Sequence, residues 1–177
     1  MSGSTEYSLP FRRGSTYKDG SDLTLSSTVG EAIVGRVYKT VDDDGKDLWL
    51  RAVRADAALT DVGGKAVSYT SGNLGKNVDA LCNSSGEICS IVDDAYATTD
   101  DIEQYDIFYV VEEGDVDAAA ESDVNAAGVA VMGYATSDSV TTATAGLYIV
   151  GVSNEAVSAG ICSIHVTGGL KPSDPAS

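Results

Sequence analysis

The chain has 177 residues, enough for one compact domain or two small β modules with a buried core. Val, Ile and Thr together number 42, against 32 for Leu, Met, Lys, Arg, Gln and Glu combined, so the composition favours strands over helices. The net charge of −16 argues against nucleic acid or an anionic membrane surface as the main partner, because both would repel the chain.

The first element in chain order is a polar segment, residues 1–20, in which aromatic residues alternate with basic ones. Pro10 favours an extended conformation, and the segment contains no apolar core of the kind that a secretory signal has. Two interpretations remain open: a loose terminus, or an extended arm that docks on a neighbouring subunit or a shell, since its aromatics would otherwise have nothing to pack against. The expected contact residues are Tyr7, Leu9, Phe11, Arg12 and Arg13.

The strongest local prediction is a β-hairpin around the turn Asp42–Lys46. A strand is expected over Ala32–Thr40 before the turn and another over Asp47–Arg54 after it. In the second strand, alternation places Leu48 and Leu50 on one face and Trp49 and Arg51 on the other.

Further strands are expected on both sides of an acidic stretch, Asp93–Asp106, which we interpret as a loop or a boundary between two halves. Asp79–Cys82 and Glu87–Val92 flank Asn83–Gly86 and predict a second hairpin. Asp115–Ala127 is evenly balanced between a short helix and a non-helical segment. The remaining predicted strands are Asp22–Ser26, Gly64–Thr70, Asp106–Val111 (buried on both faces), Gly128–Ala135, Gly146–Ser153 and Gly160–Thr167.

These elements predict an all-β fold, a small β-barrel or a β-tulip or sandwich-like module with an extended N-terminal arm. The expected parts are the arm (1–20), a β-rich half (21–104), an acidic β-rich half (105–170) and a loose tail (171–177). The two halves can be separate or one continuous domain. Their charge differs: residues 1–76 carry ten basic and ten acidic side chains, and residues 77–177 carry one basic and seventeen acidic ones.

Histidine and cysteine offer little chemistry. His165 is the single histidine, and strand alternation points it away from Cys162, so the two cannot form a nucleophile–base pair. The odd number of cysteines, Cys82, Cys89 and Cys162, favours buried free thiols over a disulfide, and a reduced, intracellular origin.

Acidic residues offer no clear metal site. The turn that starts at Asp42 fails the calcium-loop pattern, which requires Asp or Asn where Lys46 stands. The carboxylates of Asp93–Asp106 could gather a weak cation, but a solvated acidic face is favoured. We therefore expect no catalytic residues, no metal and no cofactor.

The stretch Gln104–Gly169 is the most distinctive part of the sequence. A Val-rich strand leads into the acidic turn Glu112-Glu113-Gly114, an Ala-Ala-Gly step follows at 126–128, then the strand Gly146–Ser153 and an Ala-Gly step at 159–160. This pattern resembles the capsid decoration (cement) and capsid-fibre proteins of tailed bacteriophages. The resemblance implies a β-barrel or β-tulip-like module, often trimeric, on the outer capsid surface.

The leading hypothesis is a non-enzymatic virion protein that decorates and stabilises a bacteriophage capsid by bridging shell subunits. Its expected partners are the major capsid protein and other copies of itself, as a homotrimer; no nucleic acid and no membrane is expected. Its location would be the outer surface of the virion, after assembly in the host cytoplasm. The alternatives are a minor tail, neck or fibre-base component, or a carbohydrate- or surface-binding β module.

Overall fold

The computed structural model describes residues 9–18 and 28–167. The predicted strand Asp22–Ser26, the predicted contact residue Tyr7 and the tail 171–177 lie outside the described residues. Among the residues described, no helix has both the length and the apolar character that crossing a membrane requires.

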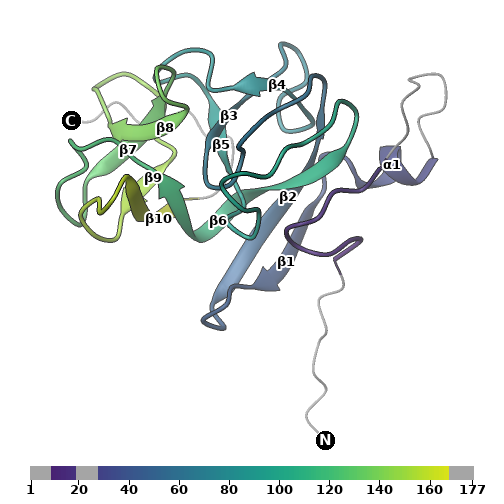
Figure 1. The fold of residues 1–177 in the computed structure, drawn as a ribbon, viewed down its shortest axis with the longest axis horizontal. Coiled ribbons are helices and arrows are strands. Elements are labelled where there is room, and N and C mark those ends of the chain that lie inside the picture. The colour runs from purple at the N-terminus through teal and green to yellow at the C-terminus, as the bar shows by residue number, and fades with distance from the viewer. Residues whose placement is uncertain (1–8, 19–27, 168–177) are drawn as a thin grey trace, which may run out of the picture.

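The described chain is nearly all β, which confirms the predicted fold class (Figure 1). Ten strands form one sheet in the order β1-β2-β4-β3-β5-β6-β10-β9-β7-β8, and an additional β2–β6 pairing closes five of them into a ring. The elements are α1 (Thr28–Ile33), β1 (Val37–Val41), β2 (Asp47–Ala55), β3 (Ala66–Tyr69), β4 (Asn77–Leu81), β5 (Cys89–Val92), β6 (Ile107–Ala119), β7 (Ala130–Tyr134), β8 (Ser139–Thr142), β9 (Gly151–Ser153) and β10 (Ile161–Thr167).

The hairpin of β1 and β2 is confirmed, with Val41 opposite Asp47 at its closed end. The turn is stabilised by the carboxylate of Asp42, which accepts hydrogen bonds from the backbone N–H groups of Asp44 (3.0 Å) and Lys46 (2.7 Å). Gly45 supplies the positive φ of 80° that such a turn needs. In β2, Leu48 and Leu50 are buried while Trp49 is 37% exposed, as the alternation predicts.

The start of this hairpin differs from the prediction. Residues Thr28–Ile33 form a short helix, so the expected strand Ala32–Thr40 is wrong in its first part. Gly35, at a φ of 82°, follows the helix, and the strand begins only at Val37. A glycine in the left-handed region is a common way to end a helix, which explains the boundary.

The second predicted hairpin is wrong. β4 and β5 do not pair, because β3 lies between them: Val67 pairs with Leu81 on one side and with Ser90 on the other. The connection between β4 and β5 instead folds around the carboxylate of Glu87, which accepts hydrogen bonds from the N–H groups of Asn83 (2.9 Å) and Ser84 (3.0 Å).

For Asp115–Ala127, where a short helix and a non-helical segment were evenly balanced, the structure shows the non-helical alternative. β6 continues through Asp115 to Ala119 and pairs with β10 over seven residue pairs, from Glu113↔Thr167 to Ala119↔Ile161. Burial alternates along this part, since Val116 and Ala118 are buried and Asp117 is exposed. Pairing with β10 therefore outweighs the weak helix preference of these residues.

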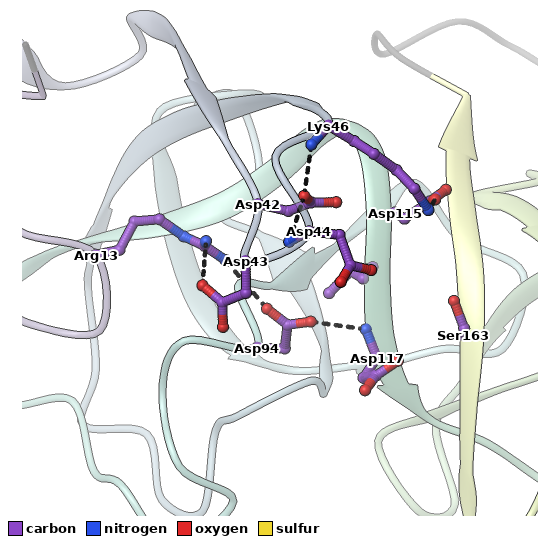
Figure 2. A pocket seen from close by; sticks show the side chains of 10 residues that line it. Arg13, Asp42, Asp43, Asp44, Lys46, Asp94, Asp115, Asp117 and Ser163 are labelled. Atoms are coloured by element: carbon purple, nitrogen blue, oxygen red, sulfur yellow. Dashed lines mark hydrogen bonds and ion pairs between the residues drawn. The ribbon is translucent and has the colours of Figure 1, made fainter. Parts of the chain in front are cut away.

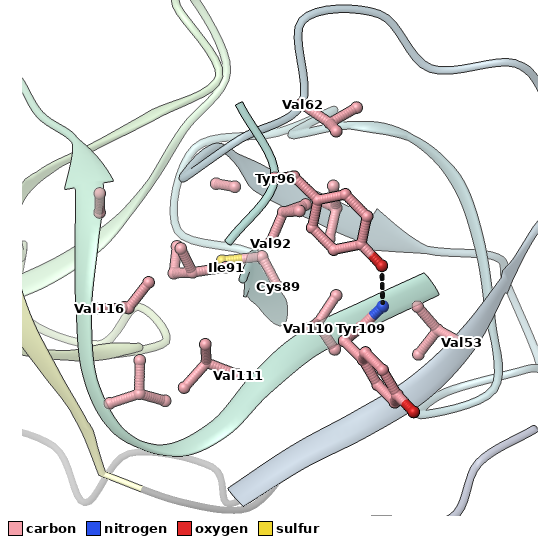
Figure 3. Close-up of a cluster of buried hydrophobic side chains, with 14 of the residues drawn as sticks. Val53, Val62, Cys89, Ile91, Val92, Tyr96, Tyr109, Val110, Val111 and Val116 are labelled. Carbon is pink, nitrogen blue, oxygen red and sulfur yellow. Dashed lines mark hydrogen bonds between the residues drawn. The ribbon is translucent and has the colours of Figure 1, made fainter. Parts of the chain in front are cut away.

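β6 lies at the centre of the fold. Its first five residues, Ile107–Val111, are all buried, as predicted for a strand covered on both faces. Figure 3 shows the side chains of Tyr109, Val110 and Val111 among Val, Ile and Cys neighbours, with Tyr96 above Tyr109. β6 pairs with β2, β5 and β10, so it joins strands from both parts of the sequence. The three cysteines are buried and free, which confirms that prediction.

Candidate interaction site

Residues 9–18 lie along the start of β6 and are held there by a pair of aromatic rings. The rings of Phe11 and Tyr109 stack with their centroids 4.2 Å apart and their planes 9° from parallel. The hydroxyl of Tyr109 donates a hydrogen bond to the carbonyl of Phe11 (3.1 Å). This contact joins an apolar surface to a backbone hydrogen bond, which fixes the position of the segment along β6.

A buried ion pair is the second attachment. Arg13 donates from Nε to Oδ2 of Asp93 (2.9 Å) and from one terminal nitrogen to Oδ1 (2.6 Å), and the same nitrogen reaches Asp94 (3.1 Å). The Asp93 side chain is 0% exposed and that of Arg13 is 16% exposed. The hydrogen bonds to Asp93 raise the pKa of Arg13 further above its ordinary value, although its burial opposes this. Asp93 therefore depends on Arg13 for its charge to be compensated.

Backbone contacts complete the attachment. Tyr17 and Ile107 exchange two hydrogen bonds as an antiparallel bridge (2.8 and 2.9 Å). The hydroxyl of Tyr96 donates to the carbonyl of Ser15 (2.6 Å). Gly14 passes so close that an added Cβ would lie 2.3 Å from the carbonyl oxygen of Ala95. The segment thus packs closely against β6 and the loop before it.

At its end the segment carries one more cation. Lys18 lies 2.8 Å from a carboxylate oxygen of Glu103 and 2.7 Å from one of Asp106. Hydrogen bonds to Asp106 and then to Glu103 raise the pKa of Lys18, and Lys18 in turn lowers that of Glu103. Residues 9–18 are the described part of the predicted arm, 1–20, and from here on we call these ten residues the arm. We call Asp93–Tyr109 the receptor.

The structure places the predicted contact residues as follows. Phe11 and Arg13 face the receptor of the same chain, and Leu9 packs partly buried against the core. Arg12 is exposed. The premise that the arm's aromatics have nothing in their own chain to pack against does not hold, since Phe11 stacks on Tyr109. Contact of the arm with a partner remains a prediction.

The sequence analysis did not predict the receptor, because it interpreted Asp93 only as part of an acidic loop. A signal was present: acidic residues at 93, 94, 103 and 106 match an arm with three basic residues and no acidic one. The buried strand ending at Val92 also places Asp93 next to the core, where a carboxylate needs a cation.

An acidic pocket of about 200 Å³ lies beside the arm, between the β1–β2 turn, the receptor and β6 (Figure 2). Six carboxylates and two cations line it. These residues are Asp42, Asp43, Asp44, Asp94, Asp115 and Asp117, with Arg13 and Lys46. Arg13 thus lies at the border of the pocket and the receptor.

Local contacts set the protonation of two of these carboxylates. Burial raises the pKa of Asp94, with a further contribution from the charge of Asp93. Burial alone would raise the pKa of Asp115, but hydrogen bonds from His165, Lys46 and Asn154 outweigh it and hold that pKa below its ordinary value. Side chains of the protein itself therefore compensate part of the pocket's negative charge, chiefly at Asp94 and Asp115.

The histidine, serine and cysteine side chains that could act in catalysis are engaged in other interactions. His165 Nδ1 lies 2.8 Å from Asp115, and Ser163 accepts a hydrogen bond from Asn154 (3.1 Å). Burial raises the pKa of Cys82 to about 11 and also raises that of Cys89, which disfavours their thiolates. Over residues 9–18 and 28–167, no group of three or more His, Cys, Asp or Glu side chains is arranged to hold a metal ion.

No protein-family model and no curated protein matches the chain. Among solved structures, the fold is similar to the N base of head fiber gp8.5 in bacteriophage phi29, with a TM-score of 0.44 and 13% sequence identity. The match covers 69% of this chain and 97% of that one. A likeness of this size carries no argument about function.

Proposed function

We propose that this chain is a non-enzymatic structural protein of a bacteriophage virion, which decorates the outer capsid surface and stabilises it as a homo-oligomer. The observation that carries the proposal is the stretch that resembles phage decoration and capsid-fibre proteins. Within the described residues, that stretch forms the five strands from β6 to β10, with β6 at the centre of the fold. The resemblance thus falls on a contiguous β unit.

The distribution of charge supports the same role. The net charge of −16 falls entirely within residues 77–177, and part of it is on exposed side chains such as Asp101, Asp123 and Glu155. A particle covered by such a surface repels other particles and polyanions. The basic residues, by contrast, are concentrated in the arm and the first strands. Several of them pair with carboxylates of this chain, and the exposed Arg12 is the one that we expect to meet acidic side chains of a shell subunit.

Copy number in purified particles tests the proposal. We expect quantitative mass spectrometry to find this chain at a constant molar ratio to the major capsid protein. A few copies per particle would instead support a fibre-base, tail or neck component. Absence from particles would refute the virion role and favour the surface-binding module.

Exposed Arg12 tests whether the arm contacts the shell. We expect Arg12→Glu to weaken attachment to particles assembled without this chain, because the substitution reverses an exposed charge of the arm and leaves the Arg13–Asp93 ion pair in place. Arg36→Glu is the matched control, since it reverses the charge of another exposed arginine, outside the arm. Equal attachment of the two variants would exclude Arg12 from the contact.

A further inference from the structure

We propose that, when copies of this chain associate, the arm of one copy occupies the receptor of a neighbouring copy. The inference deepens the proposed homo-oligomeric role and rests on it. The receptor would then serve as an interaction site whose partner is a second copy of the chain.

Charge and shape both make the receptor selective for this segment. The arm contributes two cations to the contact, and the receptor contributes four carboxylates. The pairs are Arg13 with Asp93 and Asp94, and Lys18 with Glu103 and Asp106. Between them, the Phe11–Tyr109 stack and the close passage of Gly14 over Ala95 leave room for a short aromatic–arginine–glycine segment.

The residues that form the receptor are far from the arm in the sequence. The arm's side-chain hydrogen bonds to the rest of the chain reach residues 80 to 98 positions away, between Asp93 and Tyr109, and Arg13 also lies 3.8 Å from Asp43 in the β1–β2 turn. The receptor itself is fixed by the ring, because β6 pairs with both β2 and β5. An arm from another copy would therefore make the same contacts, as in exchange of an identical element between protomers.

The connecting chain is long enough for exchange. Nine residues, 19–27, separate the arm from α1. Fully extended, they span at most about 30 Å. A domain of this length has a radius of gyration of roughly 16 Å. Exchange is therefore possible wherever a neighbour's receptor lies within that span of α1, and it adds a link between copies while keeping every arm contact.

Disulfide trapping tests the proposal on the purified chain. The Tyr17↔Ile107 bridge places Lys18 opposite Asp106, and these side chains already meet at 2.7 Å. Chains carrying Lys18→Cys are mixed with longer, tagged chains carrying Asp106→Cys, unfolded and refolded together, oxidised, and separated on a denaturing gel without reductant. We expect a product that contains one chain of each kind and disappears on reduction. The native cysteines are buried and contribute little background.

The matched control replaces Asp106→Cys by Ser122→Cys, an exposed site just beyond the opposite end of β6. Exchange predicts several-fold more two-chain product for Asp106→Cys than for this control. Equal amounts would overturn the proposal, and a single-chain disulfide in the Lys18→Cys/Asp106→Cys double variant would then show that the arm stays with its own receptor. Because the experiment contains no particles, its failure leaves the copy-number result standing, and failure of the virion role leaves the disulfide result standing.

Discussion

Replacing Arg13 by alanine should destabilise the protein by about 3 kcal/mol, because it leaves the carboxylate of Asp93 buried without its cation. Loss of one partner of a buried ion pair commonly destabilises by about 3–5 kcal/mol. We take the lower end, since Arg13 keeps 16% of its side-chain surface exposed and water can reach part of the site. For a chain of this length, the midpoint of thermal unfolding should fall by roughly 6–12 °C.

Urea unfolding followed by far-ultraviolet circular dichroism measures this change. Arg12→Ala is the matched control: it removes the same side chain one position earlier in the arm, where it is exposed, and should change stability by less than about 0.5 kcal/mol. Hydrogen exchange at the amide of Ile107, which bonds to the carbonyl of Tyr17, reports whether the arm has come off the receptor.

A double-mutant cycle with Asp93→Ala separates the ion pair from other losses. The Arg13→Ala/Asp93→Ala variant should be less destabilised than the sum of the two single variants, since neither charge is then left alone. The reasoning is refuted if Arg13→Ala is as stable as Arg12→Ala, or if the two single effects simply add. Either result would mean that the pair does not hold the arm.

Two further predictions concern the core and the acidic pocket. Gly133→Ala should destabilise the protein by about 1–3 kcal/mol, because the added Cβ would lie 2.7 Å from Sγ of Cys89 and 3.1 Å from Sγ of Cys82. Urea unfolding measures this loss, and adding Cys89→Ala should restore part of it. A Gly133→Ala variant of wild-type stability would contradict the packing. The lowered pKa of Asp115 means that its stabilising contribution is complete above its ordinary value of 3.8 and is lost as the pH falls through the lower, folded-state pKa. Asp115→Asn should therefore reduce stability near neutral pH, and the difference from wild type should shrink below about pH 4; a difference that does not change with pH would contradict this.

The sequence predicted most strands from local features, but it missed β8, which pairs with the neighbouring β7, and of the predicted strand Gly146–Ser153 only Gly151–Ser153 forms β9. The β1–β2 hairpin follows from its Asp/Gly turn and the alternation of Leu48 to Arg51, and both features are properties of neighbouring residues. The start of β6 follows from an unbroken apolar run. The order of β3, β4 and β5 does not follow in this way. The place of β3 between β4 and β5 depends on how the whole ring of five strands closes, and no short stretch of sequence encodes that. Asp115–Ala119 likewise becomes a strand through β10, more than forty residues later in the chain.

The arm shows the same division between local and distant information. The aromatic and basic residues of residues 1–20 indicate, by themselves, that this segment packs against another surface. The identity of the surface depends on Tyr109 and Asp93, which the fold brings together from a strand and a loop. Their chemistry nevertheless constrains the answer, since a carboxylate with no exposed surface must find a cation, and the chain from 77 onward has only Lys171 to offer. Arg13, in the first part of the chain, supplies that cation in the structure, and the first part of another copy carries the same arginine.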